Sequence, residues 1–354
     1  MLLGRSFCQL ATKMTANYRS LSLETILNSI DFPNGKRPKL LVTCSDVPVS
    51  YIDTLRRKCD VSVCQGTSRE QILQATPGAE GILWLTADRL DGEVLDKAGP
   101  QLNAVSTLTS GMDYVDAKEF VKRGIALGHT PRVVNNPVAD IAIGLMIAAA
   151  RRFHEGRLKI LNSDWEQRPQ WMLGQDVVGS TVGIVGFGGI GQTIAKRLQG
   201  FDLGKLLYTG HKPKTEADQF GAQFVSFGDL LRESDFVFIV CPLTLETREI
   251  FNAEAFKLMK PTSVLINVAR GGIVDQKALV NALKNGTIFA AGLDVMTPEP
   301  LQPNDPVLNL PNCIIVPHLG TATRQSLEDM FAICAHNVLS ALSGKPMEAP
   351  FNRP

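Results

Sequence analysis

The stretch that decides the fold is TVGIVGFGGIGQTIAKRL, residues 181–198. A short apolar run over 181–185 predicts a strand, and 192–198 predicts a helix. A lone G-x-G-x-x-G is a weak signal, but between a strand and a helix its glycines let the backbone approach a pyrophosphate, whose charge then lies at the helix N-terminus. We therefore interpret this turn as dinucleotide-binding. Its residues are Gly186, Gly188, Gly189, Ile190 and Gly191.

The next predicted strand, 206–209, indicates which dinucleotide is bound. In NAD-binding units an Asp or Glu about 20 residues beyond the glycines binds the adenosine ribose hydroxyls. Here Gly210 occupies the strand end, and His211, Lys212 and Lys214 follow. A 2′-phosphate would meet positive charge there, so we predict NADP(H), with NADH as a weaker alternative. The competing interpretation is a solvated turn with no binding role.

Working outward, the chain alternates short apolar runs with helical patterns in two series. Five strand candidates lie between Lys39 and His129, and six lie between Thr181 and His318. This alternation predicts an α/β protein with mostly parallel sheets, and six strands suit a doubly wound dinucleotide fold.

Three further segments connect or close these series. A helix is predicted over 137–152, with Asn135 and Asn136 as cap candidates, and a long closing helix is predicted over 322–342. Residues 155–179 show no clear period and predict an extended arm or loop.

Composition excludes several classes of protein. A chain of 354 residues holds about two domains. Its 36 Lys and Arg balance 35 Asp and Glu, which leaves no basic footprint for nucleic acid. The longest strongly apolar stretch, 141–150, is too short to span a membrane. Seven scattered cysteines without a C-x-x-C pair indicate neither a disulfide framework nor a cysteine zinc site, and the histidines lack metal-ligand spacing.

The N-terminal stretch is a separate case. Residues 1–23 contain Arg5, Lys13 and Arg19, several Ser and Thr, and no acidic residue before Glu24. This composition is transit-peptide-like and would imply mitochondrial import. The alternative, an unstructured extension of a cytoplasmic protein, is our expectation. Residues 1–36 are accordingly set apart from the predicted fold.

A second group of candidate residues follows the later strands. Arg270 lies in INVARGG, Glu299 in AGLDVMTPEP and His318 in VPHLGTAT. Ligands bind at the carboxyl ends of strands in such sheets; Arg can hold a carboxylate through two bonds, and His can transfer a proton near neutral pH. Taken one at a time, each residue has an alternative role: Arg270 could form a surface ion pair, Glu299 could be a turn residue, and His318 could be a core histidine. Asp294 is predicted to contact nicotinamide, with a cap or turn role as the alternative.

Several long motifs in order carry a resemblance. The sequence resembles the D-isomer-specific 2-hydroxyacid dehydrogenases, most closely the glyoxylate/hydroxypyruvate reductases, over about residues 38–348. The likeness rests on TSGMDYVD (109–116), the fingerprint 186–191, LYTG followed by basic residues, INVARGGIVD (266–275), AAGLDVMTPEPL (290–301) and PHLGTAT (317–323).

The resemblance implies an architecture. A Rossmann nucleotide-binding domain, 133–318, would be inserted into a flavodoxin-like substrate domain made of 37–132 and 319–354. The active site would lie in the cleft between them, and the protein would form homodimers.

The resemblance also implies roles for individual residues. Arg270 would bind the substrate carboxylate and carbonyl, His318 would be the acid/base and Glu299 its partner. Backbone groups of Ser110 and Gly111 would close on the carboxylate. Pro242, Val268, Asp294 and Gly320 would line the nicotinamide half of the cofactor site. One departure is Gly189, where the family often has Arg, so one cation near the phosphates is lost.

The expected function is NADPH-dependent reduction of glyoxylate and hydroxypyruvate to glycolate and D-glycerate. One alternative is an enzyme like phosphoglycerate dehydrogenase. The other is a nucleotide-sensing corepressor of the C-terminal-binding type, which would use NAD and carry an acid where this chain has Gly210.

Overall fold

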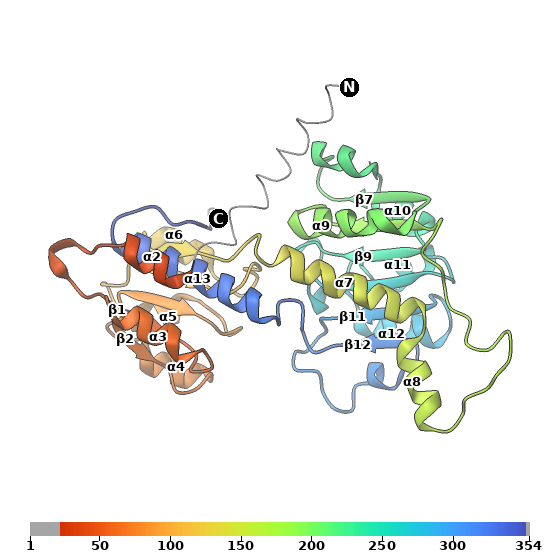
Figure 1. The fold of residues 1–354 in the computed structure, drawn as a ribbon, viewed down its shortest axis with the longest axis horizontal. Coiled ribbons are helices and arrows are strands. Elements are labelled where there is room, and N and C mark those ends of the chain that lie inside the picture. The colour runs from red at the N-terminus through yellow and green to blue at the C-terminus, as the bar shows by residue number, and fades with distance from the viewer. Residues whose placement is uncertain (1–21, 352–354) are drawn as a thin grey trace. The chain divides into compact units, whose positions relative to one another are not determined.

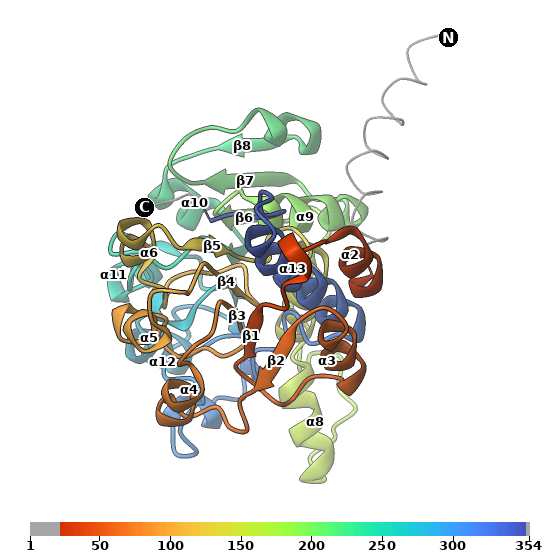
Figure 2. The same cartoon turned by 90° about the vertical axis from the view of Figure 1, so that its left-hand side faces the viewer.

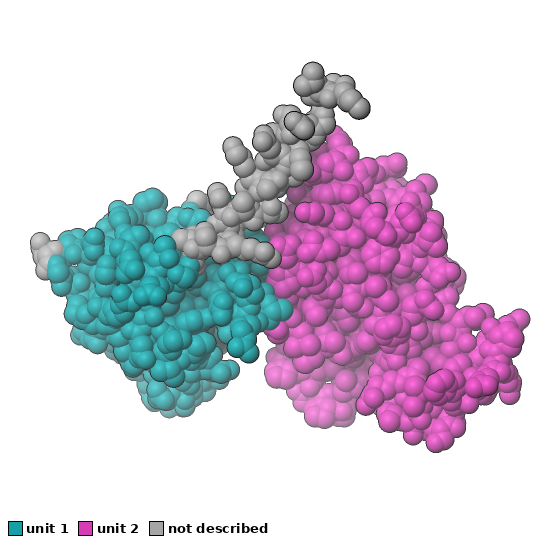
Figure 3. Space-filling model, viewed as in Figure 1, with its two compact units in different colours: residues 1–134, 323–354 teal, residues 135–322 magenta. Residues whose placement is uncertain are grey.

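The computed structural model describes residues 22–351, which form two compact units (Figure 3). The first is built from the chain up to Val134 together with the segment from Thr323 onward, and the second from Asn135–Ala322. Each unit is an α/β structure with one parallel sheet. The domain boundaries predicted from the sequence, at 132/133 and 318/319, differ from these by two and four residues.

The first unit contains a five-stranded sheet in the order β2-β1-β3-β4-β5 (Figure 2). This is the flavodoxin-like order, with its switch point between β1 and β3. The strands are β1 Lys39–Val42, β2 Asp60–Val63, β3 Gly81–Trp84, β4 Ala104–Thr107 and β5 Ala126–Gly128. The helices between them are α3 Val49–Arg56, α4 Arg69–Ala75, α5 Gly92–Ala98 and α6 Ala117–Arg123.

Two helices from opposite ends of the chain complete this unit. Helix α13 (Arg324–Leu342) packs on β3 and β4 and contacts α2 (Leu23–Ser29). Ser22 caps α2 by accepting a hydrogen bond from the Thr25 N–H, and Ile26 and Leu27 are buried in the core. The expectation that the chain up to residue 36 lies outside the fold is therefore wrong from residue 22 onward. The remainder of that stretch, with its transit-peptide-like composition, lies outside the described residues.

The second unit contains a seven-stranded parallel sheet in the order β12-β11-β10-β9-β6-β7-β8. Figure 1 labels β12, β11, β9 and β7 of this sheet. Its strands are β6 Thr181–Val185, β7 Lys205–Thr209, β8 Ala222–Phe224, β9 Phe236–Ile239, β10 Val264–Asn267, β11 Ala290–Leu293 and β12 Cys313–Ile315. The order reverses between β6 and β9, where doubly wound folds bind their ligands. The sequence predicts six of these strands. It misses β8, an edge strand of three residues, two of them exposed, which has no apolar run to reveal it.

Helices cover this sheet: α7 Asn135–Ala150, α8 Phe153–Leu161, α9 Gly189–Leu198, α10 Phe227–Glu233, α11 Ala253–Leu258 and α12 Gln276–Lys284. Short 3₁₀ turns occupy Pro33–Gly35, Gln199–Phe201, Thr215–Phe220, Gly271–Ile273 and Pro306–Asn309. Helix α8 corrects the loop predicted over 155–179. It has no buried residue, so its sequence shows no helical periodicity.

The predicted caps of α7 are also wrong. Asn135 and Asn136 lie inside the helix, and neither side chain accepts a backbone N–H within residues 22–351. The closing helix begins at Arg324, where the Thr323 side chain accepts a hydrogen bond from the Ser326 N–H.

Within residues 22–351, neither a membrane-spanning helix nor a metal-binding cluster is present. None of their helices is both long and apolar enough to cross a membrane. They also contain no cluster of three or more His, Cys, Asp or Glu able to hold a metal ion.

Candidate active site

The glycine-rich turn follows β6 at the switch point of the seven-stranded sheet. Gly186 has φ +99°, and a Cβ there would lie 2.7 Å from the backbone nitrogen of Cys241, just after β9. A Cβ on Gly191 would lie 2.3 Å from the Gly186 carbonyl oxygen. Both positions therefore exclude any side chain, and the close approach of turn and helix depends on glycine.

Gly188 is different, because a Cβ there would meet no atom within 4 Å. It stands at the N-cap of α9 without a capping side chain, so the first N–H groups of the helix are not covered by one. An open, glycine-lined helix start of this kind suits a pyrophosphate. The residues present therefore fit a bound dinucleotide.

The turn after β7 contains the predicted cations. Gly210, His211, Lys212 and Lys214 are all exposed, and within residues 22–351 the side chains of His211, Lys212 and Lys214 form no ion pair. The Tyr208 hydroxyl accepts a hydrogen bond from the Lys214 N–H at 2.8 Å, which anchors the turn to its strand.

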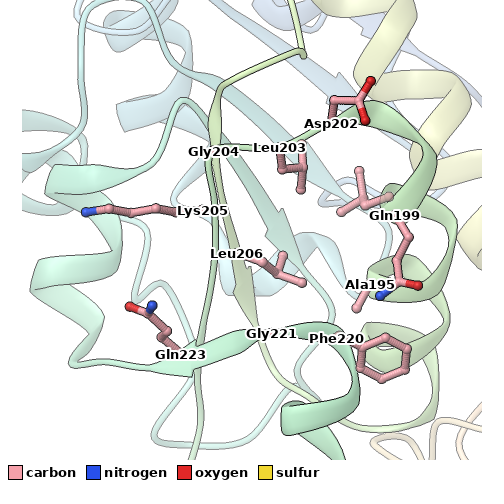
Figure 4. A pocket seen from close by; sticks show the side chains of 11 residues that line it. Ala195, Gln199, Asp202, Leu203, Gly204, Lys205, Leu206, Phe220, Gly221 and Gln223 are labelled. Atoms are coloured by element: carbon pink, nitrogen blue, oxygen red, sulfur yellow. The ribbon is translucent and has the colours of Figure 1, made fainter.

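A cavity of about 420 Å³ lies at the other end of β7 (Figure 4). Its lining includes Lys205 at the start of β7, Gly221 just before β8, and Phe220. It therefore lies at the amino ends of these strands and contains none of the predicted site residues.

A polar pair joins His318 to Glu299. Nδ1 of His318 lies 2.8 Å from Oε2 of Glu299, and Oε1 of Glu299 accepts the Met296 N–H at 2.9 Å. The hydrogen bond with Glu299 raises the pKa of His318 against the opposing effect of burial, and the charges of Glu299 and Asp294 raise it further. Burial favours a higher pKa for Glu299, but its bonds with His318 and Met296 outweigh this and lower its pKa.

The His318 backbone is held in a strained conformation. Its φ is +52°, a left-handed value that costs a non-glycine residue roughly 1–3 kcal/mol. The His318 N–H donates to the Asp294 carbonyl at 2.9 Å, and the Asp294 carboxylate accepts the N–H groups of Leu319 at 2.6 Å and Gly320 at 3.0 Å. Asp294 thus fixes the loop that carries His318, and its predicted contact with nicotinamide stays a prediction. Burial raises the pKa of Asp294, while these hydrogen bonds oppose the rise.

Arg270 follows β10 in a turn fixed by a buried asparagine. Asn267 Nδ2 donates to the Arg270 carbonyl at 3.0 Å, and Asn267 Oδ1 accepts the Ala269 N–H at 3.1 Å. A Cβ on Gly271 would lie 2.0 Å from the Met296 carbonyl oxygen, so the Arg270 turn packs directly on the loop that leads to Glu299. The charge of Arg270 lowers the pKa of both His318 and Glu299. Sequence reasoning missed Asn267, although Asn at a strand end is a turn signal.

The remaining predicted residues of this unit lie at the same sheet edge. Pro242 follows β9, is exposed, and accepts a hydrogen bond from the Thr247 hydroxyl at 2.7 Å. Val268 follows β10 and is buried. A Cβ on Gly320 would lie 2.9 Å from Asp294 Oδ2, so glycine is required beside that carboxylate.

Ser110 and Gly111 belong to the other unit, in the turn after β4. Thr109 shapes this turn, because its hydroxyl accepts the Gly111 N–H at 3.2 Å and its carbonyl accepts the Thr130 N–H at 2.9 Å. His129 Nδ1 lies 3.4 Å from the Ser110 carbonyl oxygen.

The fold and this edge define an NAD(P)-dependent oxidoreductase that acts on CH–OH groups. Residues 143–320 match the family model for the NAD-binding domain of D-isomer specific 2-hydroxyacid dehydrogenases. The chain belongs to this family, and the predicted α/β Rossmann architecture and family resemblance are confirmed.

Its relatives include the human glyoxylate reductase/hydroxypyruvate reductase, 41% identical over 308 residues that cover 85% of this chain and 94% of the relative. A glyoxylate reductase from Thermococcus kodakarensis is 40% identical, with coverage of 87% and 94%. Among solved structures, an NADPH-dependent glyoxylate/hydroxypyruvate reductase from Sinorhizobium meliloti in complex with NADP and malonate superposes with TM-score 0.79 at 29% identity, over 90% of this chain and 97% of that one. The D-2-hydroxyacid dehydrogenase activity expected from the sequence is thereby supported.

Proposed function

We propose that this protein is an NADPH-dependent reductase that converts glyoxylate to glycolate and hydroxypyruvate to D-glycerate. The observation that carries the proposal is the His318–Glu299 pair, whose Nδ1 and Oε2 atoms lie 2.8 Å apart. The charge of Arg270 acts on the pKa of His318, and all three residues follow strands of the sheet whose carboxyl ends also carry the glycine-rich turn. The names of the relatives support the same substrates.

The side chains divide the chemistry between binding and proton transfer. When bound, the nicotinamide supplies the hydride that reaches the carbonyl carbon. Arg270 holds the substrate carboxylate through paired hydrogen bonds and polarises the carbonyl. Protonated His318 gives its proton to the carbonyl oxygen, which becomes the hydroxyl of the product.

Glu299 prepares His318 for this step. By accepting from Nδ1 it fixes the ring so that Nε2 carries the transferable proton, and its charge keeps the imidazole protonated to higher pH. In the proposed assignment Asp294 contacts the nicotinamide from the loop it holds, and Pro242, Val268 and Gly320 line the same half of the cofactor.

A substrate and cofactor panel tests the proposal. Steady-state rates are measured for glyoxylate, hydroxypyruvate, pyruvate and 3-phosphohydroxypyruvate, each with NADPH and NADH. The highest catalytic efficiency is expected for glyoxylate or hydroxypyruvate with NADPH. A preference for 3-phosphohydroxypyruvate would favour the phosphoglycerate dehydrogenase alternative, and binding of NADH without turnover would favour the nucleotide-sensing corepressor.

NADPH preference rests on His211, Lys212 and Lys214, exposed and without ion-pair partners in the described chain. The substitution Gly210→Asp adds a carboxylate that accepts bonds from the ribose hydroxyls of NADH and repels the 2′-phosphate of NADPH. A Cβ at Gly210 meets no atom within 4 Å, so the variant should fold. The ratio of catalytic efficiencies should shift toward NADH. An unaltered ratio at fixed ionic strength would show that this turn does not read the 2′ position.

A homodimer is proposed from an exposed apolar surface on α8 and the segment after it. Phe153, Ile160, Leu161, Trp165 and Leu173 are each more than half exposed, as apolar side chains at an interface would be in the isolated chain. Ile160→Asp should convert the dimer to a monomer in light scattering after size-exclusion chromatography. A wild type that is already monomeric would overturn the proposal.

The proposed compartment is the cytoplasm, with mitochondrial import through residues 1–23 as the alternative. The six described cysteines are all unpaired thiols, which suits a reducing compartment. Imaging of the full chain with a C-terminal fluorescent tag separates the two.

A further inference from the structure

One polar side chain beside the glycine turn has no assigned role. Asn135 is the first residue of α7, and Gly189 is the first residue of α9. A Cβ placed on Gly189 would lie 2.4 Å from Nδ2 of Asn135 and 2.9 Å from its Oδ1 and Cγ. The amide of Asn135 therefore fills the space that a side chain at position 189 would occupy.

The Asn135 amide does not serve its own helix. An asparagine at a helix start usually accepts a backbone N–H of the first turn, but Asn135 forms no hydrogen bond within residues 22–351. Its neighbour Asn136 differs, because its Oδ1 accepts from Nη2 of Arg197 at 3.1 Å. Arg197 also donates to Asp140 at 2.9 Å, so Asn136 is part of a hydrogen-bonded contact between α7 and α9, whereas the Asn135 amide packs against Gly189 without a hydrogen bond in the described residues.

We infer that Asn135 is a cofactor-binding residue, whose amide Nδ2 donates a hydrogen bond to the pyrophosphate of the dinucleotide at the glycine turn. The amide of Asn135 is an uncharged hydrogen-bond donor. Because the side chain is partly exposed and its N–H groups are unused, it can donate to a phosphate oxygen. Gly189 leaves the room that this amide needs. The inference rests on dinucleotide binding at the turn and is independent of the substrate and of the NADPH preference.

The pyrophosphate is common to NADPH and NADH, and this sets the expected pattern. Loss of the amide should weaken both dinucleotides by the same factor, whereas the cations after β7 affect only their ratio. Adenosine 2′-monophosphate has the 2′-phosphate but no pyrophosphate, so its binding should not depend on Asn135.

Binding is measured by isothermal titration calorimetry with the full chain. Asn135→Ala should raise the Kd of NADPH and of NADH about 10-fold each, the size of one hydrogen bond to a charged acceptor, and leave the Kd of adenosine 2′-monophosphate unchanged. The matched control Asn136→Ala should bind both dinucleotides like wild type. Unchanged dinucleotide affinities in Asn135→Ala would overturn the inference, whereas a wild type that binds neither dinucleotide would overturn the proposed function instead.

Two further variants separate a phosphate contact from simple packing. Asn135→Asp keeps the shape but replaces the donor with a negative charge, so it should weaken both dinucleotides more than Asn135→Ala does; wild-type affinity would show a packing role only. Gly189→Ala should displace the amide and weaken binding in wild type, but have a smaller effect in the Asn135→Ala background. Equal effects in both backgrounds would show that Gly189 does not act through Asn135.

Discussion

The two sheets of this chain differ at the same topological position. In the five-stranded sheet the strand order reverses between β1 and β3, and there the hydroxyl of the buried Thr43 accepts the Leu85 N–H at 2.8 Å and so ties the two strand ends together. In the seven-stranded sheet the order reverses between β6 and β9, and there Gly188 starts α9 without a capping side chain and with no atom within 4 Å of the position of a Cβ. Strand alternation builds both sheets, but the second turn leads into an open, glycine-lined helix start that suits a phosphate. The pattern of strands thus indicates fold, whereas the turn chemistry indicates function.

Two histidines, one after an edge strand of each sheet, show the same difference between the sheets. His318 follows β12, an edge strand of the larger sheet, and is bonded to Glu299. His129 follows β5, an edge strand of the smaller sheet, where its ring packs edge-on against Phe351 with centroids 5.4 Å apart. We expect chemistry from the first and a structural role from the second.

The largest effect is expected from His318→Ala, which removes the proton donor. Turnover should fall by about 10²–10⁴-fold while NADPH affinity stays near the wild-type value. His129→Ala, the histidine control from the other sheet, should change turnover only a few-fold. The measurement is kcat for glyoxylate reduction beside the NADPH Kd, and comparable losses of kcat in both variants would erase the functional distinction between the sheets.

Arg270→Lys is expected to have the next largest effect. A lysine keeps the charge but cannot make two parallel bonds to a carboxylate, so kcat/KM for glyoxylate should fall roughly 10- to 100-fold, mainly through KM. Arg248→Lys is the control, because Arg248 is an exposed arginine close to Gly272 in the neighbouring turn. If both variants kept wild-type kcat/KM, Arg270 would not be the carboxylate ligand.

Gly188→Ala should separate binding from folding. A Cβ there meets no protein atom, so the Tm should stay close to that of wild type, but the methyl group occupies the side open to the phosphates and should weaken NADPH about 10-fold. Gly144 lies in the middle of α7, where an added Cβ would meet no atom within 4 Å. Gly144→Ala is therefore the control, and it should leave the NADPH affinity unchanged while raising the free energy of unfolding by about 0.5–1 kcal/mol. Calorimetric affinity and thermal melts decide this, and full affinity in Gly188→Ala would place the phosphates elsewhere.

The smallest effect is a displaced pH profile. Reduction requires protonated His318, so the rate declines as pH rises through the His318 pKa, which Glu299 raises. Glu299→Gln removes that negative charge and lowers the pKa, so the alkaline limb of kcat/KM should move to lower pH. Asp294→Asn should move it in the same direction by less, since the charge of Asp294 contributes less than Glu299 to the raised pKa. A profile that coincides with wild type in Glu299→Gln would mean that the pair is not coupled.

The sequence predicts much of this site because its chemistry lies at strand ends. Arg270, Glu299 and His318 stand in separate motifs, and the parallel sheet brings the carboxyl ends of β10, β11 and β12 together. Their assembly follows from the rule that carboxyl ends of parallel strands share one edge. The catalytic roles themselves stay predictions.

Contacts that depend on tertiary structure were not predictable in this way. Asn267 orders the Arg270 turn through hydrogen bonds to backbone groups, and Asn135 meets Gly189 across 54 positions of sequence. In the sequence, an asparagine at a helix start gives the same signal whether its side chain caps that helix or contacts another helix. Helix α8 was missed because none of its side chains is buried, so no apolar stripe marks it.

Helix α13 has a consequence for how the chain matures on the ribosome. The first unit begins at the N-terminal side, yet its core contains Phe331, Cys334 and Val338 of α13, which are translated after the whole of the second unit. Domains usually fold in the order of their synthesis. Here the five-stranded sheet emerges first but must wait with one face uncovered until about 190 further residues have been made, a span that follows from Asn135–Ala322. The nascent chain is therefore expected to complete its dinucleotide-binding unit first and to expose the β3–β4 face to chaperones during elongation.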